Sequence, residues 1–287
     1  MSAGERLLGE EFAVNSAPTL DAHIIAPAQF PYADGPGYMP RADEVGDRQA
    51  FARVLGAHEV SHALLVQPSC YGYDNRAMLD AMDASEGRIK GIAVVPPEIP
   101  DRDMRRLGDR GVVGVRLNLM RSDPDALTRP GGKAFLSRMK AFGWFVQVYA
   151  TGDVWAGVEA PLRRSGVLVL VDHFGDPDLT RSIDQPGFQA VLRLGRETDA
   201  VVKLSAAYRP SRRPFPHEDV EPFVTAAIEA YGLDRCLWGS DWPFINTSQQ
   251  VEYGALLRLL SRWVPTPTDQ EKVLWSTPAR LFGFTAP

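Results

Sequence analysis

The 287-residue sequence predicts a single-domain α/β protein whose eight parallel strands close into a (β/α)8 barrel, the TIM-barrel architecture. Short apolar runs alternate with longer segments of helical character, which is the order of a parallel barrel. The runs are continuously apolar, as expected for strands buried on both faces. The length also suits a barrel, which typically has about 250 residues. A doubly wound open sheet is the alternative, because periodicity alone does not show closure.

The predicted elements follow one another along the whole chain. The strands are expected at 18–25, 60–67, 89–95, 112–119, 144–150, 167–173, 200–205 and 235–241. The helices are expected near 47–57, 74–84, 101–110, 132–142, 153–164, 187–197, 218–231 and 247–262. No linker or repeat divides the chain, so we predict one domain over 1–287. Residues 1–16 are expected to be an N-terminal extension, and 267–287 a C-terminal capping segment.

The loop after the first predicted strand, residues 26–45, is long and rich in Pro and Gly. Such loops commonly serve as lids or binding loops. Its aromatic residues Phe30, Tyr32 and Tyr38 indicate packing against the protein or a ligand rather than free solvation.

Composition excludes several classes of partner. The net charge is -5, which gives no basic surface for nucleic acid. No apolar run is long enough to span a membrane, and the charged N-terminus does not resemble a secretory signal. Cys70 and Cys236 form no CxxC motif or Cys/His cluster. We therefore expect a cytoplasmic protein with no nucleic-acid or membrane partner, and the sequence leaves its oligomeric state open.

Polar residues stand where most of the predicted strands end. In a barrel these ends meet at the face that carries the chemistry. The candidate residues are His23, Ser69, Arg116, Tyr149, His173, Arg209 and Asp241. We predict that they converge on one pocket.

Each candidate also has a structural interpretation. A lone histidine at a strand end is often structural, but two histidines and an aspartate converging on one point favour a site. Arg116 lies inside an apolar strand, where a cation is costly unless it is paired or functional, and we favour ligand binding over an ion pair. Asp241 could cap the following helix, but we favour a catalytic role.

Six motifs resemble the amidohydrolase superfamily. They are DAHIIAPAQFPY, LLVQPSCYG, GVRLNL, VLVDHFGDPD, VKLSAAYR and WGSDWP, and they occur in family order from about residue 18 to 282. The sequence is most similar to the amidohydrolase-2 branch, and within it to 2-pyrone-4,6-dicarboxylate lactonases and related sugar-lactone enzymes. The resemblance implies a barrel that hydrolyses a carboxylated cyclic ester.

The resemblance also implies residue roles. Asp241 would be the base that takes a proton from the attacking water, while His23 and His173 would polarise the lactone carbonyl. The residues implied to bind substrate carboxylates are Ser69, Tyr149, Arg116, Arg209, Arg121 and Tyr38.

The chain departs from the family at Ile25, which stands where the family has the second histidine of a His-x-His pair. If zinc or manganese is bound, its ligands would be His23, His173 and Asp241. Arg116 would repel a nearby divalent cation, so the residues favour chemistry without a metal or other cofactor.

The arginines provide an independent argument about the substrate. A cationic pocket on an acidic protein suits a small anion, and a guanidinium binds a carboxylate through two hydrogen bonds. We therefore predict a metal-independent hydrolase of a small anionic lactone. The alternatives are a lactone isomerase, a metal-dependent decarboxylase of the same superfamily, and a catalytically weakened barrel that binds a small carboxylate.

Overall fold

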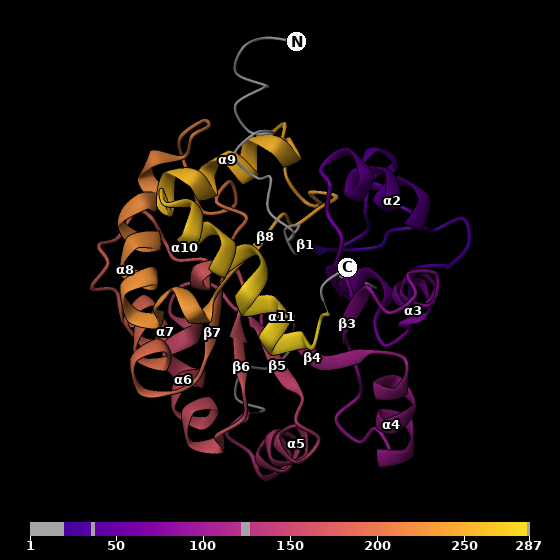
Figure 1. Ribbon diagram of the computed structural model, residues 1–287. Helices are drawn as coiled ribbons and strands as arrows, with labels where there is room; N and C mark the ends of the chain where they lie inside the picture. Colours follow the sequence, from indigo (N-terminus) through magenta and orange to yellow (C-terminus); the bar gives the residue numbers. More distant parts are fainter. Residues whose placement is uncertain (1–19, 36–37, 122–126, 286–287) are drawn as a thin grey trace.

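The computed structural model describes residues 20–35, 38–121 and 127–285. It contains an eight-stranded parallel sheet whose strands follow in sequence order, β1 to β8. The strands are β1 (Leu20–Ala22), β2 (Ala63–Val66), β3 (Ile89–Ala93), β4 (Val112–Asn118), β5 (Phe145–Tyr149), β6 (Val169–Val171), β7 (Val201–Ser205) and β8 (Cys236–Gly239). Helices surround the strands on the outside (Figure 1).

Contacts between the first and last strands bring the sheet to a nearly closed barrel. The His23 N–H donates to the Trp242 carbonyl at 2.8 Å, and the Asp241 N–H donates to the Asp21 carbonyl at 2.9 Å. Gly239 permits this approach, because a Cβ there would lie 2.8 Å from the Cβ of Asp21. The predicted barrel is confirmed, and the open sheet is excluded.

The helices occur in the predicted order. They are α2 (Arg48–Ala57), α3 (Arg76–Asp83), α4 (Asp101–Asp109), α5 (Pro130–Ala141), α6 (Val154–Ser165), α7 (Pro186–Glu197), α8 (Glu221–Tyr231), α9 (Tyr253–Trp263), α10 (Pro267–Glu271) and α11 (Thr277–Phe282). None of the helices within the described ranges is long and apolar enough to cross a membrane.

Several strands end earlier than predicted, at the residues that face the pocket. β6 ends at Val171 and β8 at Gly239, whereas the predicted strands extend to His173 and Asp241. The backbone of His173 (φ 48°) and of Asp241 (φ 61°) turns into the left-handed region, which is incompatible with an extended strand. These turns carry the polar side chains out of the sheet.

The turn after β6 is fixed by a side chain from the helix that precedes this strand. Trp155 of α6 is fully buried, and its Nε1–H donates to the carbonyls of Gly175 at 2.8 Å and of Ala150 at 3.0 Å. α6 ends at Ser165 and is followed by Gly166, whose φ of 62° is the left-handed conformation that glycine adopts easily. The indole thus ties α6 to the backbone segments that follow β5 and β6.

The end of the barrel opposite the pocket is apolar and covered by the C-terminal segment. Interior residues Leu64, Phe145 and Leu237 form one cluster with Phe282 and Phe284. A π-helical turn, Lys272–Ser276, connects α10 to α11, which lies across the strands in Figure 1. This segment covers the N-terminal ends of the strands, so the candidate site lies at their C-terminal ends.

Candidate active site

A pocket of about 390 Å³ lies at the C-terminal ends of the strands. Eight of the nine residues singled out from the sequence line it: His23, Tyr38, Ser69, Arg116, Arg121, Tyr149, His173 and Arg209. The ninth, Asp241, is 1% exposed and contacts both histidines from behind the pocket wall. The structure therefore brings all nine together.

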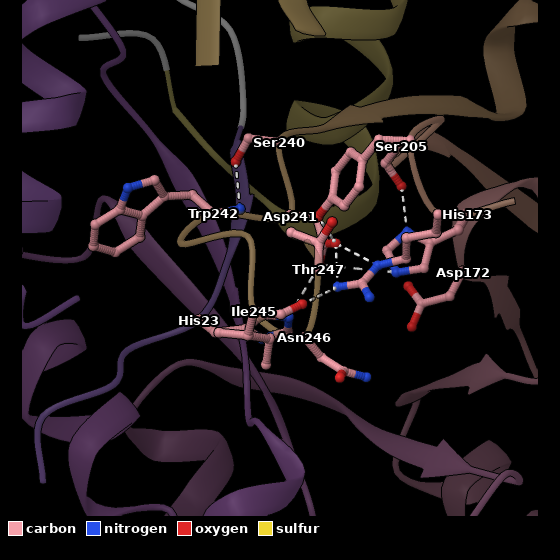
Figure 2. A network of polar contacts seen from close by, with 12 residues as sticks. His23, Asp172, His173, Ser205, Ser240, Asp241, Trp242, Ile245, Asn246 and Thr247 are labelled. Carbon is pink, nitrogen blue, oxygen red and sulfur yellow. Dashed lines mark hydrogen bonds and ion pairs between the residues drawn. The ribbon is translucent and has the colours of Figure 1, made fainter. Parts of the chain in front are cut away.

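The Asp241 carboxylate is held from several sides. Its Oδ1 lies 3.3 Å from the Nε2 of His23 and 3.9 Å from the Nε2 of His173. Its Oδ2 accepts hydrogen bonds from the Tyr208 hydroxyl at 2.6 Å and from the Nε of Arg209 at 2.7 Å. Figure 2 shows Asp241 in this network with His173 and Ser205. One carboxylate oxygen is thus anchored, and the other faces the histidines.

The surrounding charges keep Asp241 ionised. Burial by itself would raise the pKa of this carboxyl, but Arg209, His173 and the hydrogen bond with His23 outweigh burial and hold the pKa well below its usual value. Burial alone would lower the pKa of the Arg209 guanidinium, but the Asp241 carboxylate raises this pKa above its usual value. Arg209, predicted to bind a substrate carboxylate, lines the pocket and is also the counter-ion of Asp241.

Both histidines are oriented by their Nδ1 atoms. The Nδ1 of His23 lies 2.7 Å from the Val66 carbonyl, which can only accept, so Nδ1 carries a proton and Nε2 faces Asp241. The Nδ1 of His173 lies 2.8 Å from the Ser205 hydroxyl. Burial lowers the pKa of His173 to about 4 against the attraction of Asp241, so this imidazole is neutral at neutral pH.

Arg116 lies where either of the roles that the sequence left as alternatives is possible, because it contacts a carboxylate and also borders the pocket. Its Nε lies 3.6 Å from the Oδ2 of Asp172, and its guanidinium carbon lies 5.6 Å from the ring centre of Tyr149. Within the described residues, this Nε has no hydrogen-bond partner. The side chain is 9% exposed and reaches the pocket, so its charge is partly balanced by Asp172 and partly directed at the pocket.

Two further pocket residues, Ser69 and Tyr38, already have hydrogen-bond partners. Ser69 accepts a hydrogen bond from the Asn118 amide at 2.9 Å. The Tyr38 hydroxyl donates to Glu44 and accepts from the Asn246 N–H at 2.9 Å, which fastens the loop after β1 to the loop after β8. Burial and the bond to Glu44 raise the pKa of Tyr38 to about 12, so it remains a phenol.

Sequence reasoning missed a charged cluster inside the barrel. The Lys203 ammonium lies 2.5 Å from the Oδ2 of Asp21 and 3.0 Å from the Oδ1 of Asp172. Gln147 donates to Asp172 at 2.8 Å. Burial opposes ionisation of Asp172, but Lys203, His173 and Arg116 lower its pKa below the usual value. The signal was present, because Lys203 interrupts an apolar strand just as Arg116 does.

Three observations bear on metal binding. Ile25 is fully buried in the core, and its N–H and carbonyl pair with Gly46 at 2.8 and 2.9 Å. Among the described residues, no group of three His, Cys, Asp or Glu side chains could hold a metal ion. Arg209 already neutralises the Asp241 carboxylate. These residues do not fit a divalent cation.

Known proteins share this sequence and fold. A family model described as Amidohydrolase matches residues 19–284. The 2-pyrone-4,6-dicarboxylate hydrolase of Comamonas testosteroni is 31% identical over 93% of this chain and 90% of that protein. The 4-sulfomuconolactone hydrolase of Rhizobium radiobacter is 30% identical over 91% of this chain and 88% of that protein.

A solved structure agrees with these relatives. The crystal structure of a probable 2-pyrone-4,6-dicarboxylic acid hydrolase from Acinetobacter baumannii, with citric acid bound, has a TM-score of 0.82 to this chain. The two are 30% identical, and the match covers 94% of this chain and 100% of that chain. With the family model spanning nearly the whole barrel, the chain belongs to the amidohydrolase family, in its amidohydrolase-2 branch.

Proposed function

We propose that this chain hydrolyses a small carboxylated lactone, resembling a 2-pyrone dicarboxylate or a sugar-acid lactone, through a water molecule that Asp241 deprotonates. The observation that carries the proposal is the position of the Asp241 Oδ1, 3.3 Å from His23 and 3.9 Å from His173 beside a cationic pocket. The relatives support it, because their names describe hydrolases of a pyrone dicarboxylate and of a sulfomuconolactone.

Substrate binding would rest on the arginines. Arg116, Arg121 and Arg209 line the pocket of a protein whose net charge is -5, so the local charge is opposite to that of the whole molecule. Guanidinium groups bind carboxylates through two parallel hydrogen bonds, which would set the orientation of the lactone ring as well as bind it. Ser69, Tyr149 and Tyr38 would complete the binding of the substrate's carboxylates.

The reaction would proceed by addition and elimination. Asp241 takes a proton from water as the water oxygen attacks the lactone carbonyl carbon. The tetrahedral intermediate collapses by breaking the ring C–O bond, and the leaving oxygen takes the proton back from Asp241. Because the pKa of Asp241 is held low, the carboxylate is ionised and available as the base at neutral pH.

The histidines would stabilise the developing oxyanion. When the Ser205 hydroxyl donates to the Nδ1 of His173, the Nε2 of this neutral ring carries the proton and can donate into the pocket. His23 donates its Nδ1–H to Val66, which holds its Nε2 beside Asp241 at the pocket, where it would polarise the lactone carbonyl. One oxyanion donor is typically worth about 2.7–4 kcal/mol of transition-state stabilisation.

We further propose that the reaction needs no metal. Ile25 removes one family ligand, and the Oδ2 of Asp241 is engaged by Tyr208 and Arg209, which leaves a poor ligand set for a divalent cation.

The test is a panel of carboxylated lactones incubated in ¹⁸O-labelled water, with the products followed by NMR and mass spectrometry. Hydrolysis predicts a ring-opened acid that carries one ¹⁸O atom in the new carboxylate. A rearranged ring without label would indicate a lactone isomerase, and released carbon dioxide a decarboxylase. Tight binding of a dicarboxylate with no turnover of any lactone would indicate a catalytically weakened barrel, and each of these three results would overturn the proposal.

A further inference from the structure

A buried carboxyl group that the proposed reaction does not use lies directly behind the pocket wall. Asp176 follows the turn His173–Gly175 and is 9% exposed. The hydroxyl of Tyr149, at the end of β5, donates to the Oδ2 of Asp176 at 3.0 Å. Tyr149 itself lines the pocket, so one residue contacts Asp176 and also borders the space that the substrate would occupy.

We propose that Asp176 is a positioning residue that decides whether the Tyr149 hydroxyl donates to the substrate. When Asp176 is ionised, it accepts the Tyr149 proton, and only an oxygen lone pair faces the pocket. When Asp176 is protonated, it donates to the Tyr149 oxygen, and the Tyr149 O–H turns to a substrate carboxylate. This inference rests on the proposed function in one respect, that the pocket binds a carboxylated molecule.

The geometry allows the Tyr149 hydroxyl proton to change its hydrogen-bond partner without any movement of the tyrosine ring. A phenol has one proton to donate, so Asp176 and a bound anion compete for it. The Tyr149 ring is held in place because it packs edge-on against His173 at 5.6 Å between ring centres and lies 5.6 Å from the guanidinium carbon of Arg116. The ring therefore stays where it is while its hydroxyl proton changes partner.

The groups around Asp176 allow both forms near neutral pH. Burial raises its pKa most strongly, and the carboxylates of Asp241 and Asp172 add to this. The Tyr149 hydrogen bond and the charge of Arg209 act in the opposite direction, and the resulting pKa is about 6. A dicarboxylate entering the pocket adds like charge and needs the Tyr149 proton, so binding should draw a proton onto Asp176.

The backbone makes Asp176→Asn a mild substitution. Asp176 has φ 43°, a left-handed conformation that asparagine also adopts readily. The asparagine amide can donate permanently to the Tyr149 oxygen, so the variant should imitate the protonated state of Asp176 at every pH. Tyr149→Phe removes the hydroxyl and should imitate the ionised state. Asp199→Asn, which alters an exposed carboxylate, controls for the loss of one negative charge.

The experiment is isothermal titration calorimetry with benzene-1,3-dicarboxylate, whose two carboxylates stay ionised from about pH 5.5 to about pH 8. Titrations in two buffers of different ionisation enthalpy give the number of protons taken up. We expect the wild type and Asp199→Asn to take up protons on binding and to lose affinity about tenfold as the pH rises, the worth of one hydrogen bond to a charged group.

The variants separate the outcomes. Asp176→Asn should keep the low-pH affinity throughout without proton uptake, and Tyr149→Phe should bind weakly at every pH without proton uptake. Wild-type binding with no proton uptake, or uptake that persists in Asp176→Asn, would overturn the role of Asp176 and leave the proposed function standing. No binding by the wild type at any pH would overturn the carboxylate-binding pocket and the role of Asp176 together.

Discussion

The Nη2 of Arg209 lies 2.6 Å from the Oδ2 of Asp241, on the side of the carboxylate that faces away from the histidines. The ion pair keeps the carboxylate ionised in a buried setting, and the hydrogen bond from Tyr208 fixes the same oxygen. The Oδ1 is thereby left to face His23 and His173, where a water molecule could be deprotonated. In the proposed mechanism, Arg209 would therefore support the base as well as bind the substrate.

Arg209→Met should therefore affect the base and not only substrate binding. We expect kcat/KM at neutral pH to fall by about 10²- to 10³-fold, in line with the cost of removing one partner of a buried charge pair. In the wild type the pKa of Asp241 is lowered, so the base stays ionised well into the acid range. In the variant burial is no longer offset, the pKa rises, and activity should be lost as the pH falls through that raised value.

The pH profile of kcat/KM measures this effect, and Arg209→Lys, which keeps the charge, should shift the acid limb less. A profile that Arg209→Met leaves in place, with only KM raised, would instead show that Arg209 serves as a carboxylate ligand alone.

Removal of metal should leave turnover unchanged. The Asp241 carboxylate is neutralised by Arg209, and Ile25 is an apolar side chain buried in the core, so the proposed mechanism has no place for a cation. Dialysis against a chelator, followed by assay and metal analysis, checks this. Loss of activity that zinc or manganese restores would contradict the metal-free mechanism.

Ile25→His should destabilise the protein rather than create a metal site. The side chain at position 25 is fully buried in the apolar core, where a polar ring without partners costs about 1–3 kcal/mol in protein mutational data. Ile25→Val is the matched control and should cost about 0.5–1.5 kcal/mol. Chemical denaturation measures both. An Ile25→His protein of undiminished stability that binds zinc and gains activity would refute this view of the site.

Lys203→Met should lower the free energy of unfolding by roughly 3–5 kcal/mol, because it leaves the carboxylates of Asp21 and Asp172 buried without their shared cation. Lys133→Met, on the exposed face of α5, should stay within about 0.5 kcal/mol of the wild type.

The pH dependence of the Lys203 effect follows from Asp172. Its pKa is lowered in the folded state, so the stabilisation is present above the unfolded pKa of about 3.9 and is lost as the pH falls. The difference in free energy of unfolding between the wild type and Lys203→Met should therefore become smaller below about pH 4. Urea unfolding at neutral and acid pH measures it, and a difference independent of pH would argue that Lys203 stabilises by packing alone.

The sequence was a good guide to the fold because buried parallel strands produce apolar runs that stand out from the helices between them. It was less reliable at the strand ends. His and Asp are enriched among the few non-glycine residues with a left-handed backbone, but this preference is too weak to place such turns at His173 and Asp241, and the predicted strands consequently ran past the true ends.

The site was predicted as a set of residues, but the pairing among them was not. Strand order explains why residues far apart in sequence meet at one face, yet it does not tell which cation faces which carboxylate. The Arg209–Asp241 pair, the burial of Lys203 between Asp21 and Asp172, and the bond from Tyr149 to Asp176 depend on side-chain directions that only the closed barrel fixes.

The central claim is that Asp241 activates water, and Asp241→Asn tests it most directly. Asparagine tolerates the left-handed backbone at this position, where φ is 61°, and matches the shape of the carboxylate. On a lactone that the wild type hydrolyses, we expect kcat to fall by at least about 10²-fold, the lower end of what a general base contributes, with a folded protein that still binds benzene-1,3-dicarboxylate. A folded variant that hydrolyses the lactone at a near-wild-type kcat would contradict the claim.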